Sequence, residues 1–598
     1  MNINLKFYKE NNESLTKEEQ DIEKYILETP KEKYDKIIEK DTRTQTIFAL
    51  SEMRENIINW YPFQENSNIL EIGSNFGEIT GLLCEKAIRV VAIEKNLKKA
   101  ECIKKRHEKE QNLEVIVGKL EDIKLDEKFN YVILNGILEF APNYIEAENP
   151  FEGILQYAKQ MLKPDGKILL ATDNKFGIQY WAGKKYIDGS NEYKGLSEKF
   201  SKKQPQLFGK RQLEELLNNM KLSYKIYNIF PNYKIPNLIY DEKYEISKED
   251  INRNFECHDE EDIVNFIENN VLFRIIKEEK NIFNFFINSY FIEIGQNEIK
   301  NDIRYITFTN YRKKEYKIVT IIKENEVIKK AITKEAQNHI NQMIHNLQYL
   351  KEYNITPLEK QNDNIVISPF IKNAKRLDYI LENIKTLEEF KITWKPYIDM
   401  LYKNTINYED INIDKTSQYI KQYDISKLKN MKFLKHAFID LIPKNIFIID
   451  NQLEVFDQEW MKEYLPVEYI IYRGICNLNI QDNLKNKLME QYQLEDKIDL
   501  FEQLENEFRE NIMDKTILYD IFYKRPKTQA EIMSTLVHYR NLKAIAEQEL
   551  ERERQSKEYE IKIRDEQINN LTQEVNHFKY SKSWKLIEFI RKAKGKIK

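Results

Sequence analysis

The first half of the chain alternates short apolar runs with amphipathic segments. Apolar runs occur at 68–73, 89–94, 113–118, 129–134 and 166–172, and helix-like patterns separate most of them. Strands buried on both faces of a parallel sheet are almost continuously apolar, whereas helices place apolar residues every three or four positions. The alternation therefore predicts an α/β fold with a doubly wound parallel sheet, whose ligand site lies at the carboxyl ends of the strands.

The pattern changes at about residue 300. Residues 303–332 alternate apolar and polar positions in three stretches, which predicts three strands. A helix is predicted at 335–350 from apolar residues spaced three or four apart, followed by a strand at 364–371 and then by mainly helical sequence. These elements predict a separate α+β domain over residues 301–540.

The C-terminal region contains a heptad pattern. Ile561, Ile568 and Val575 are seven residues apart, and a second apolar series runs beside them. Such a repeat is typical of a coiled coil, so we expect residues 541–580 to join copies of the chain in a homo-oligomer. The alternative is one long solvated helix.

The last residues combine positive charge with apolar side chains. Residues 579–598 carry eight lysines and arginines against one glutamate, and Trp584 and Ile587 are among their apolar residues. A basic amphipathic helix of this kind binds anionic lipid. We therefore expect residues 581–598 to contact an anionic membrane surface; the alternative is a disordered basic tail. No apolar run reaches the ~18 residues that a membrane-spanning helix needs.

Length and composition indicate a protein of several domains that resides in a reducing compartment. The chain has 598 residues, of which 41% are hydrophobic, so it is too long for one core and apolar enough to fold. Its formal net charge of -4 argues against general nucleic-acid binding. The four cysteines are far apart in the sequence: Cys84, Cys102, Cys257 and Cys476. This spacing disfavours a zinc ribbon or a disulfide scaffold and indicates a cytoplasmic protein. If the basic tail binds lipid, the protein would be peripheral at the inner face of the cell membrane. The predicted order is a helical leader (1–44), the α/β domain (45–245), a connecting segment (246–300), the α+β domain (301–540), the coiled coil (541–580) and the basic tail (581–598).

Most glycines lie in one third of the chain. The chain has 15 glycines, and eleven of them fall between residues 60 and 200. Gly73 and Gly77 follow the first apolar run, where a strand turns into a helix whose free N–H groups favour an anionic ligand. Glu94 ends the second run and can accept both hydroxyls of a ribose. Together they predict a nucleoside site; a glycine turn beside a surface glutamate is the alternative.

This segment resembles the class I S-adenosylmethionine-dependent methyltransferases. The first motif of that family has an acidic residue followed by spaced glycines, which Glu71, Gly73 and Gly77 match, with Asn75 in place of the middle glycine. The resemblance covers about residues 45–240.

Further motifs carry the same resemblance. The stretch ILNGILEFAP at 133–142 matches the fourth motif of the family, and LKPDGKILLAT at 162–172 matches the turn and strand before the substrate loops. The resemblance implies a Rossmann-like methyltransferase sheet that binds S-adenosylmethionine. It places Glu94 at the ribose, and Asn135 and Gly136 beside the methionine part of the cofactor.

Three aromatic residues follow the last strand of this pattern. The segments that contain Tyr180, Trp181 and Tyr233 look like those of methyltransferases encoded in bacterial surface-polysaccharide clusters. Aromatic rings at this position can stack on a sugar ring. The alternative is that they belong to the hydrophobic core.

A second candidate site lies in residues 438–460. Asp440 and Asn445 are five residues apart, and Asp457 follows the apolar run LEVF. Phosphoryl transfer needs a carboxylate near the attacking hydroxyl, and an asparagine and a second aspartate that hold magnesium. The stretch resembles the lipopolysaccharide-kinase and aminoglycoside-phosphotransferase branch of the protein-kinase-like fold. That resemblance implies Asp440 as the catalytic residue, Asn445 and Asp457 as metal ligands, and Mg-ATP as a cofactor.

The same resemblance makes Lys329 the lysine that pairs with the nucleotide phosphates, with Glu335 as its partner. Two departures leave a kinase-like domain without catalysis as the alternative. Phe438 replaces the histidine of the catalytic loop, and the hairpin TNYRKKEY has no glycine-rich loop.

The order of the parts resembles the methyltransferase–kinases that cap O-antigen chains. We therefore expect an enzyme that methylates a bacterial surface glycan, a lipid-linked glycan or its terminal phosphate, with a kinase-like phosphotransferase domain. A phosphate oxygen is already anionic and needs no general base, and no convincing base stands out in the first domain. The alternatives are a methyltransferase whose kinase-like half only binds the glycan or a partner, and a non-enzymatic coiled-coil scaffold of a glycan-assembly complex.

Overall fold

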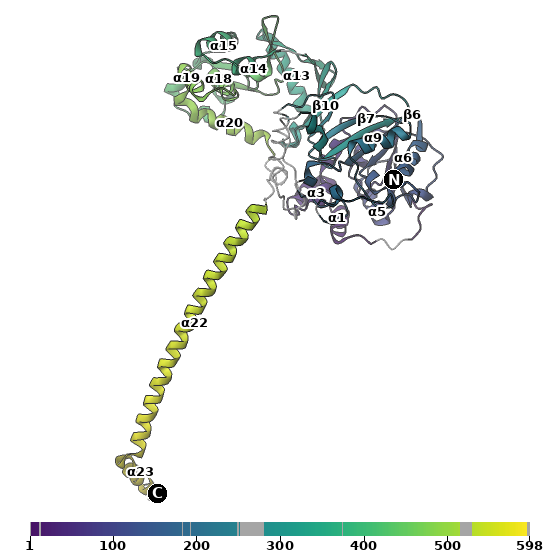
Figure 1. The fold of residues 1–598 in the computed structure, drawn as a ribbon. Coiled ribbons are helices and arrows are strands. Elements are labelled where there is room, and N and C mark those ends of the chain that lie inside the picture. Colours follow the sequence, from purple (N-terminus) through teal and green to yellow (C-terminus); the bar gives the residue numbers. More distant parts are fainter. Residues whose placement is uncertain are drawn as a thin grey trace. The chain divides into compact units, whose positions relative to one another are not determined.

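A computed structural model gives the course of the chain (Figure 1). It divides into two compact units, residues 1–526 and 527–598. The structure describes residues 2–10, 14–181, 183–191, 193–247, 250, 280–372, 375–514 and 529–594.

A large mixed sheet runs through the first unit. In the described residues it has 14 strands. Along the sheet they are β1 (Asn2–Asn4), β4 (Leu113–Val117), β3 (Arg89–Glu94), β2 (Asn68–Ile72), β5 (Phe129–Asn135), β6 (Leu162–Asp173), β9 (Ser289–Gly295), β7 (Ser223–Phe230), β8 (Leu238–Asp241), β10 (Ile303–Phe308), β11 (Ile318–Lys323), β12 (Glu326–Ala331), β15 (Ile365–Pro369) and β14 (Lys360–Asn362).

The parallel part of this sheet confirms the predicted α/β fold. Strands β4, β3, β2, β5 and β6 pair in parallel, each at one of the predicted apolar runs. Their side chains pack into two hydrophobic cores, one on each face of the sheet, because successive residues of a strand point to opposite faces. Helices α4 (Thr80–Lys86), α5 (Leu97–Arg106) and α6 (Pro150–Met161) connect the strands. The carboxyl ends of the strands therefore meet at one edge, as expected.

Two segments of this sheet differ from the prediction. The leader, residues 1–44, is not wholly helical, because β1 pairs in parallel with β4 before α1 (Lys17–Glu28) begins. The segment 246–300 was expected to be a connection, yet β9 lies antiparallel between β6 and β7, with all of its residues buried. The apolar side chains of β9 are removed from water in the middle of the sheet, which explains why this segment forms a strand there. Residues 251–279 of that segment lie outside the described residues.

The two predicted domains share one sheet. Strand β10 pairs antiparallel with β8, so that Ile306 lies opposite Ile239. From there β11, β12, β15 and β14 continue the sheet with antiparallel pairing. The strands predicted over 303–332 are confirmed, but they are an extension of the first sheet and not a sheet of their own.

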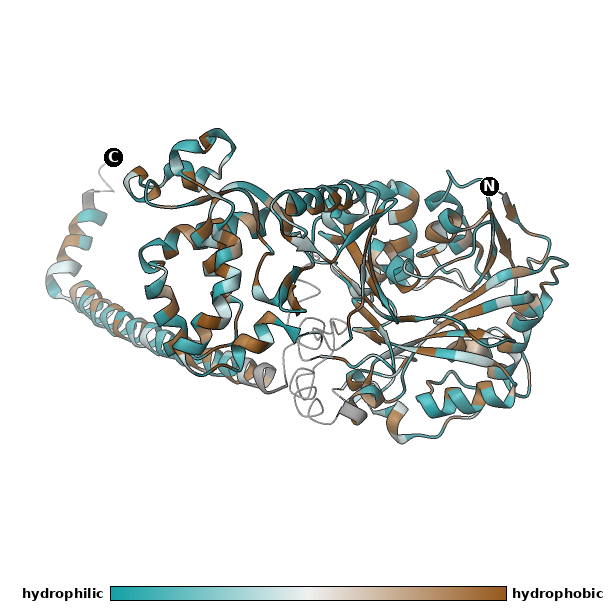
Figure 2. Cartoon of the chain, turned by 90° about the horizontal axis from the view of Figure 1, so that it is seen from above, coloured by the Kyte–Doolittle hydropathy of each residue, from teal (hydrophilic) through white to brown (hydrophobic). Residues whose placement is uncertain are grey.

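The rest of the first unit is mainly helical. Two small sheets hold the loops of the second candidate site, and they include β18 (Phe433–Phe438), β19 (Ile446–Ile449) and β20 (Gln452–Val455). A third core lies among the helices, with Trp394 and Tyr469 among its buried residues. Figure 2 shows apolar residues along the strands and on one side of many helices. The principal helices are α13 (Gln337–Glu352), α15 (Leu387–Tyr402), α18 (Val467–Cys476), α19 (Asp482–Gln491) and α20 (Ile498–Ile512).

The second unit consists of α22 (Gln529–Tyr580) and α23 (Lys582–Lys594). Helix α22 includes the predicted coiled-coil segment and begins before residue 541. Ile561, Ile568 and Val575 are exposed in the single chain. No helix among the described residues is long and apolar enough to cross a membrane.

Candidate functional site

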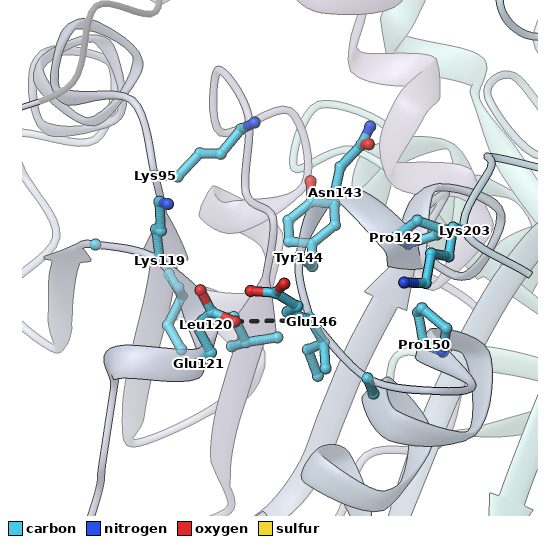
Figure 3. A pocket seen from close by; sticks show the side chains of 14 residues that line it. Lys95, Lys119, Leu120, Glu121, Pro142, Asn143, Tyr144, Glu146, Pro150 and Lys203 are labelled. Atoms are coloured by element: carbon cyan, nitrogen blue, oxygen red, sulfur yellow. Dashed lines mark hydrogen bonds between the residues drawn. The ribbon is translucent and has the colours of Figure 1, made fainter.

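A cavity of about 410 Å³ opens at the carboxyl ends of β3, β4 and β5 (Figure 3). Its size falls in the range of small-molecule sites. Lysines and glutamates from four different segments line it, and the Glu146 amide donates a hydrogen bond to the Glu121 carboxylate over 3.3 Å. The lining residues are Ile93, Lys95, Gly118, Lys119, Leu120, Glu121, Pro142, Asn143, Tyr144, Ile145, Glu146, Ala147, Pro150 and Lys203.

Glu94 lies next to this cavity, between the lining residues Ile93 and Lys95. Its carboxylate accepts hydrogen bonds of 2.9 Å from the backbone amides of Asn75 and Asn96, which fix it at the end of β3. Burial raises the pKa of Glu94, and Lys99 and the two amides oppose that rise. A held carboxylate at this place has lone pairs left for ribose hydroxyls.

The turn between β2 and α4 has the backbone that a cofactor loop needs. Gly73 and Gly77 have positive φ angles, 73° and 77°. Asn75, which stands where the family has a glycine, also has a positive φ of 48°. Asparagine tolerates this region better than most residues, so the departure from the motif leaves the turn intact.

The space above Gly73 is filled by side chains. A Cβ at Gly73 would overlap Ile137 Cδ1 and would lie 2.9 Å from the Tyr144 hydroxyl. Tyr144 also lines the cavity. A ligand that reaches from the cavity to the Gly73 turn must therefore displace the ends of these two side chains.

The other residues expected at the cofactor differ in their surroundings. Asn135 ends β5 and has a buried Oδ1 atom with no hydrogen-bond partner. Gly136 has a φ of 71°, and the Tyr233 hydroxyl lies directly over it. Glu71 is buried and accepts a hydrogen bond of 2.6 Å from Thr80 Oγ1 of α4. Burial raises the pKa of Glu71 to about 8.

Glu139 is a candidate functional residue that the sequence patterns did not indicate. It follows β5 and is 2% exposed. Its carboxylate accepts hydrogen bonds from Thr172 Oγ1 at 3.0 Å and from the Tyr233 hydroxyl at 3.4 Å. Burial raises the pKa of Glu139 to about 7, and Asp173 adds to the rise. A carboxylate with a pKa near neutral can act as a general base. The one available signal was an acidic residue inside the apolar stretch ILEFA.

The aromatic residues proposed to stack on a sugar do not form a common exposed wall. Tyr180 and Tyr233 are buried, and their hydroxyls donate to Asp173 and Glu139 respectively. Trp181 is 43% exposed. The structure therefore favours the core alternative for the two tyrosines.

This edge of the sheet coincides with a family match. Residues 70–170 match the family model of the methyltransferase domain. The chain contains a methyltransferase domain. A comparison with curated proteins finds no significant match.

Solved methyltransferase structures are among the similar folds. One is phosphoethanolamine N-methyltransferase 1 of Haemonchus contortus, in complex with phosphoethanolamine and S-adenosylhomocysteine, with 13% identity, a TM-score of 0.27, and 46% of this chain and 49% of that chain covered. NodS of Bradyrhizobium japonicum WM9 has 14% identity, a TM-score of 0.20, and 27% and 74% covered. CcbJ of Streptomyces caelestis has 15% identity, a TM-score of 0.19, and 21% and 51% covered. The chain spans about half the length of the first and the third.

Outside the methyltransferase domain, Lys329 on β12 lies among carboxylates. Its ammonium group forms ion pairs with Asp457, with Glu359 at 3.3 Å and with Glu459 at 3.7 Å. Burial alone lowers the pKa of an amine, but these three carboxylates raise that of Lys329. Glu335, the expected partner, is exposed, and Glu359 takes its place.

Asp440 and Asn445 lie together in the loop between β18 and β19. Asn445 Nδ2 donates to the Asp440 carbonyl oxygen over 3.0 Å. Burial raises the pKa of Asp440 to about 7, and Asp457 adds to the rise. The three residues line one cavity of about 510 Å³, so the structure brings together the residues predicted from their spacing.

The loop between β10 and β11 lacks glycine but reaches the same cavity. Arg312 of this loop forms a buried ion pair of 2.6 Å with Glu459. Among the described residues no group of three His, Cys, Asp or Glu side chains could hold a metal ion. Asn445 and Asp457 would give a magnesium ion two protein ligands, a number that suits magnesium bound mainly through nucleotide phosphates.

Proposed function

We propose that the methyltransferase domain binds S-adenosylmethionine and transfers its methyl group. The observation that carries this proposal is Glu94, which is buried at the end of β3, held by two backbone amides and adjacent to a cavity of about 410 Å³. The family match over residues 70–170 supports the same function.

The residues of this edge fit the cofactor in three places. Glu94 would accept the ribose hydroxyls, the positive φ angles of Gly73 and Gly77 would let the backbone approach it, and Asn135 Oδ1 is a buried acceptor without a partner. When bound, the cofactor supplies an electrophilic methyl group on sulfur. The chain would orient the acceptor for in-line approach, and this positioning accounts for much of such catalysis.

The acceptor we propose is a bacterial surface glycan, a lipid-linked glycan or its terminal phosphate. The resemblance to methyltransferases of surface-polysaccharide clusters supports this class. Glu139 adds a second possible methyl acceptor atom. As a general base near Gly136, Glu139 would allow methylation of a sugar hydroxyl as well as of a phosphate oxygen.

Calorimetric titration of the whole chain with S-adenosylhomocysteine tests the proposed function. We expect one saturable site per chain. A titration without binding heat, repeated by equilibrium dialysis with labelled S-adenosylmethionine and again negative, would contradict it.

A second function, phosphotransfer from Mg-ATP, is proposed for the cleft that contains Asp440. The supporting observation is that Lys329, 128 residues before Asp457 in the chain, pairs with Asp457 at the cleft that Asp440, Asn445 and Asp457 line. Asp440→Asn should keep Mg-ATP binding and lose phosphate transfer to a glycan acceptor. If the parent chain does not bind Mg-ATP, a domain that only holds the glycan becomes the better proposal.

For the second unit we propose self-association through α22 and contact with anionic lipid through the basic tail. The exposed heptad residues and the charge of residues 579–598 support these roles. Removal of 579–598 should abolish co-sedimentation with anionic vesicles at low salt and leave cofactor binding unchanged. Equal sedimentation of both chains would contradict the lipid role.

A further inference from the structure

Arg54 is a buried arginine without an ionic partner. It lies in the 3-10 helix η2 (Glu52–Ile57), just before β2, and is 8% exposed. Its Nε and Nη1 atoms are buried and make no hydrogen bond, and no carboxylate pairs with it among the described residues. A guanidinium group buried without an anion is costly, so its retention points to a ligand that supplies one.

The surroundings of Arg54 place it at the carboxyl end of β5. Asn56, in the same helix, donates a hydrogen bond to the Pro236 carbonyl oxygen and so attaches η2 to the segment that carries Tyr233. The Tyr233 hydroxyl lies over Gly136. Burial, Glu139 and Asp173 raise the pKa of Tyr233, and Arg54 is near enough to oppose them.

The neighbouring carboxylates already have other partners. Glu139 accepts hydrogen bonds from Thr172 and Tyr233. Asp173 accepts from Ser289 at 2.5 Å and from Tyr180 at 3.3 Å. Arg54 therefore remains the cation of this group that has no fixed anion beside it.

A second unpaired atom stands at the same strand end. Asn135 Oδ1 is a buried acceptor without a donor, and Asn135 directly precedes Gly136. A free cationic donor and a free neutral acceptor are the two groups that recognise an α-amino acid, whose carboxylate accepts and whose ammonium group donates. A phosphate of the acceptor would satisfy Arg54 but would leave Asn135 without a donor.

We propose that Arg54 binds the carboxylate of the cofactor's amino-acid end while Asn135 accepts a hydrogen bond from its ammonium group. The inference rests on the proposed function, because it assigns the second end of the same ligand. It also gives a role to η2, which precedes the methyltransferase motifs and carries Arg54.

Calorimetry with two ligands tests this assignment. S-adenosylhomocysteine carries the amino-acid end, whereas 5′-methylthioadenosine has the same nucleoside and sulfur without it. Arg54→Met should lower the affinity for the first ligand by about 10- to 100-fold and leave that for the second unchanged. The melting temperature of the ligand-free variant should rise, because an unpaired buried charge is removed.

Arg106 provides the matched control. It is equally buried, at 8% exposure, and its Nε atom also lacks a partner, but its Nη1 atom donates to the Ala49 carbonyl oxygen over 2.6 Å. Arg106→Met should lower the melting temperature and affect both ligands alike.

Each outcome is informative. Selective loss of S-adenosylhomocysteine binding in Arg54→Met supports the assignment. Equal loss for both ligands, or no loss, overturns it. Unchanged cofactor affinity together with loss of thermal stabilisation by inorganic phosphate also overturns it, because the anion would then belong to the acceptor. If the parent chain binds neither nucleoside, the proposed function fails first and the assignment falls with it.

Discussion

At the carboxyl end of β5, Arg54 and Asn135 keep buried polar atoms without protein partners, whereas at the second cleft Lys329 is engaged by three carboxylates. The first site is thus incomplete until a ligand supplies complementary groups. The second has neutralised its charges internally, and a nucleotide would have to separate Lys329 from Asp457 before binding. Buried groups without partners indicate a ligand more directly than the familiar spacing of residues does.

The largest expected effect is at the second cleft. Lys329→Met leaves Glu359, Asp457 and Glu459 without their shared cation, and breaking a buried ion pair in this way costs about 3–5 kcal/mol. The midpoint of urea unfolding at pH 7 should fall accordingly. Lys330→Met is the control, because Lys330 is the next residue and burial lowers its pKa to about 8. Equal losses in the two variants would show that the carboxylates do not depend on Lys329.

A smaller effect is expected from Glu139. Because its pKa is raised from 4.5 to about 7, the folded state holds the proton over this range while the unfolded state releases it. Stability therefore falls as pH rises from about 4.5 to about 7, by about 3 kcal/mol in all. Glu139→Gln should remove this fall. The free energy of unfolding of the variant minus that of the parent, measured in urea from pH 5 to pH 8, should therefore increase as pH rises.

Glu146→Gln is the matched control for that experiment, because Glu146 is an exposed carboxylate that lines the cavity of the methyltransferase domain. Its difference from the parent should stay constant over the same pH range. If the difference in free energy of unfolding between Glu139→Gln and the parent is also constant over this pH range, Glu139 is not the group that titrates near neutral pH.

The smallest effect separates ligand binding from stability. Glu94→Gln keeps the shape of the side chain but loses the charge that would receive two ribose hydroxyls, so S-adenosylhomocysteine affinity should fall about tenfold, or ~1.4 kcal/mol. The stability of the free protein should fall by less than in Lys329→Met, because only one of the two backbone amides that bind Glu94 loses its acceptor oxygen. The comparison is calorimetry with the Glu121→Gln variant, because Glu121 is another carboxylate that lines the cavity. Equal affinities of the two variants for S-adenosylhomocysteine would show that Glu94 does not belong to the binding site.

Local pattern was enough to predict the parallel strands and the loops at their ends. The runs at 68–73 and 89–94 became β2 and β3 because continuous apolar sequence has no other place than the middle of a sheet. The spacing of Asp440 and Asn445 likewise placed both in one loop. These features depend on residues that are near in sequence.

What the sequence could not predict depends on distant partners. β9 enters the sheet between two strands that precede it in the chain, which no local period encodes. Glu139 looks like any acidic residue until Thr172, Tyr233 and burial shift its pKa. Arg54 is noticeable only once its lack of a partner is known. Such properties arise from packing, and only a structure gives them.

The pairing of β8 with β10 has a practical consequence for dissection of the protein. Each strand covers the hydrogen-bonding edge of the other, and all four residues of β8 are buried. If the chain were cut between them, both pieces would carry a bare edge strand, which recruits other chains and leads to aggregation. The two activities proposed for this protein should therefore be separated by point substitution within the whole chain, since each half serves as the edge protection of the other.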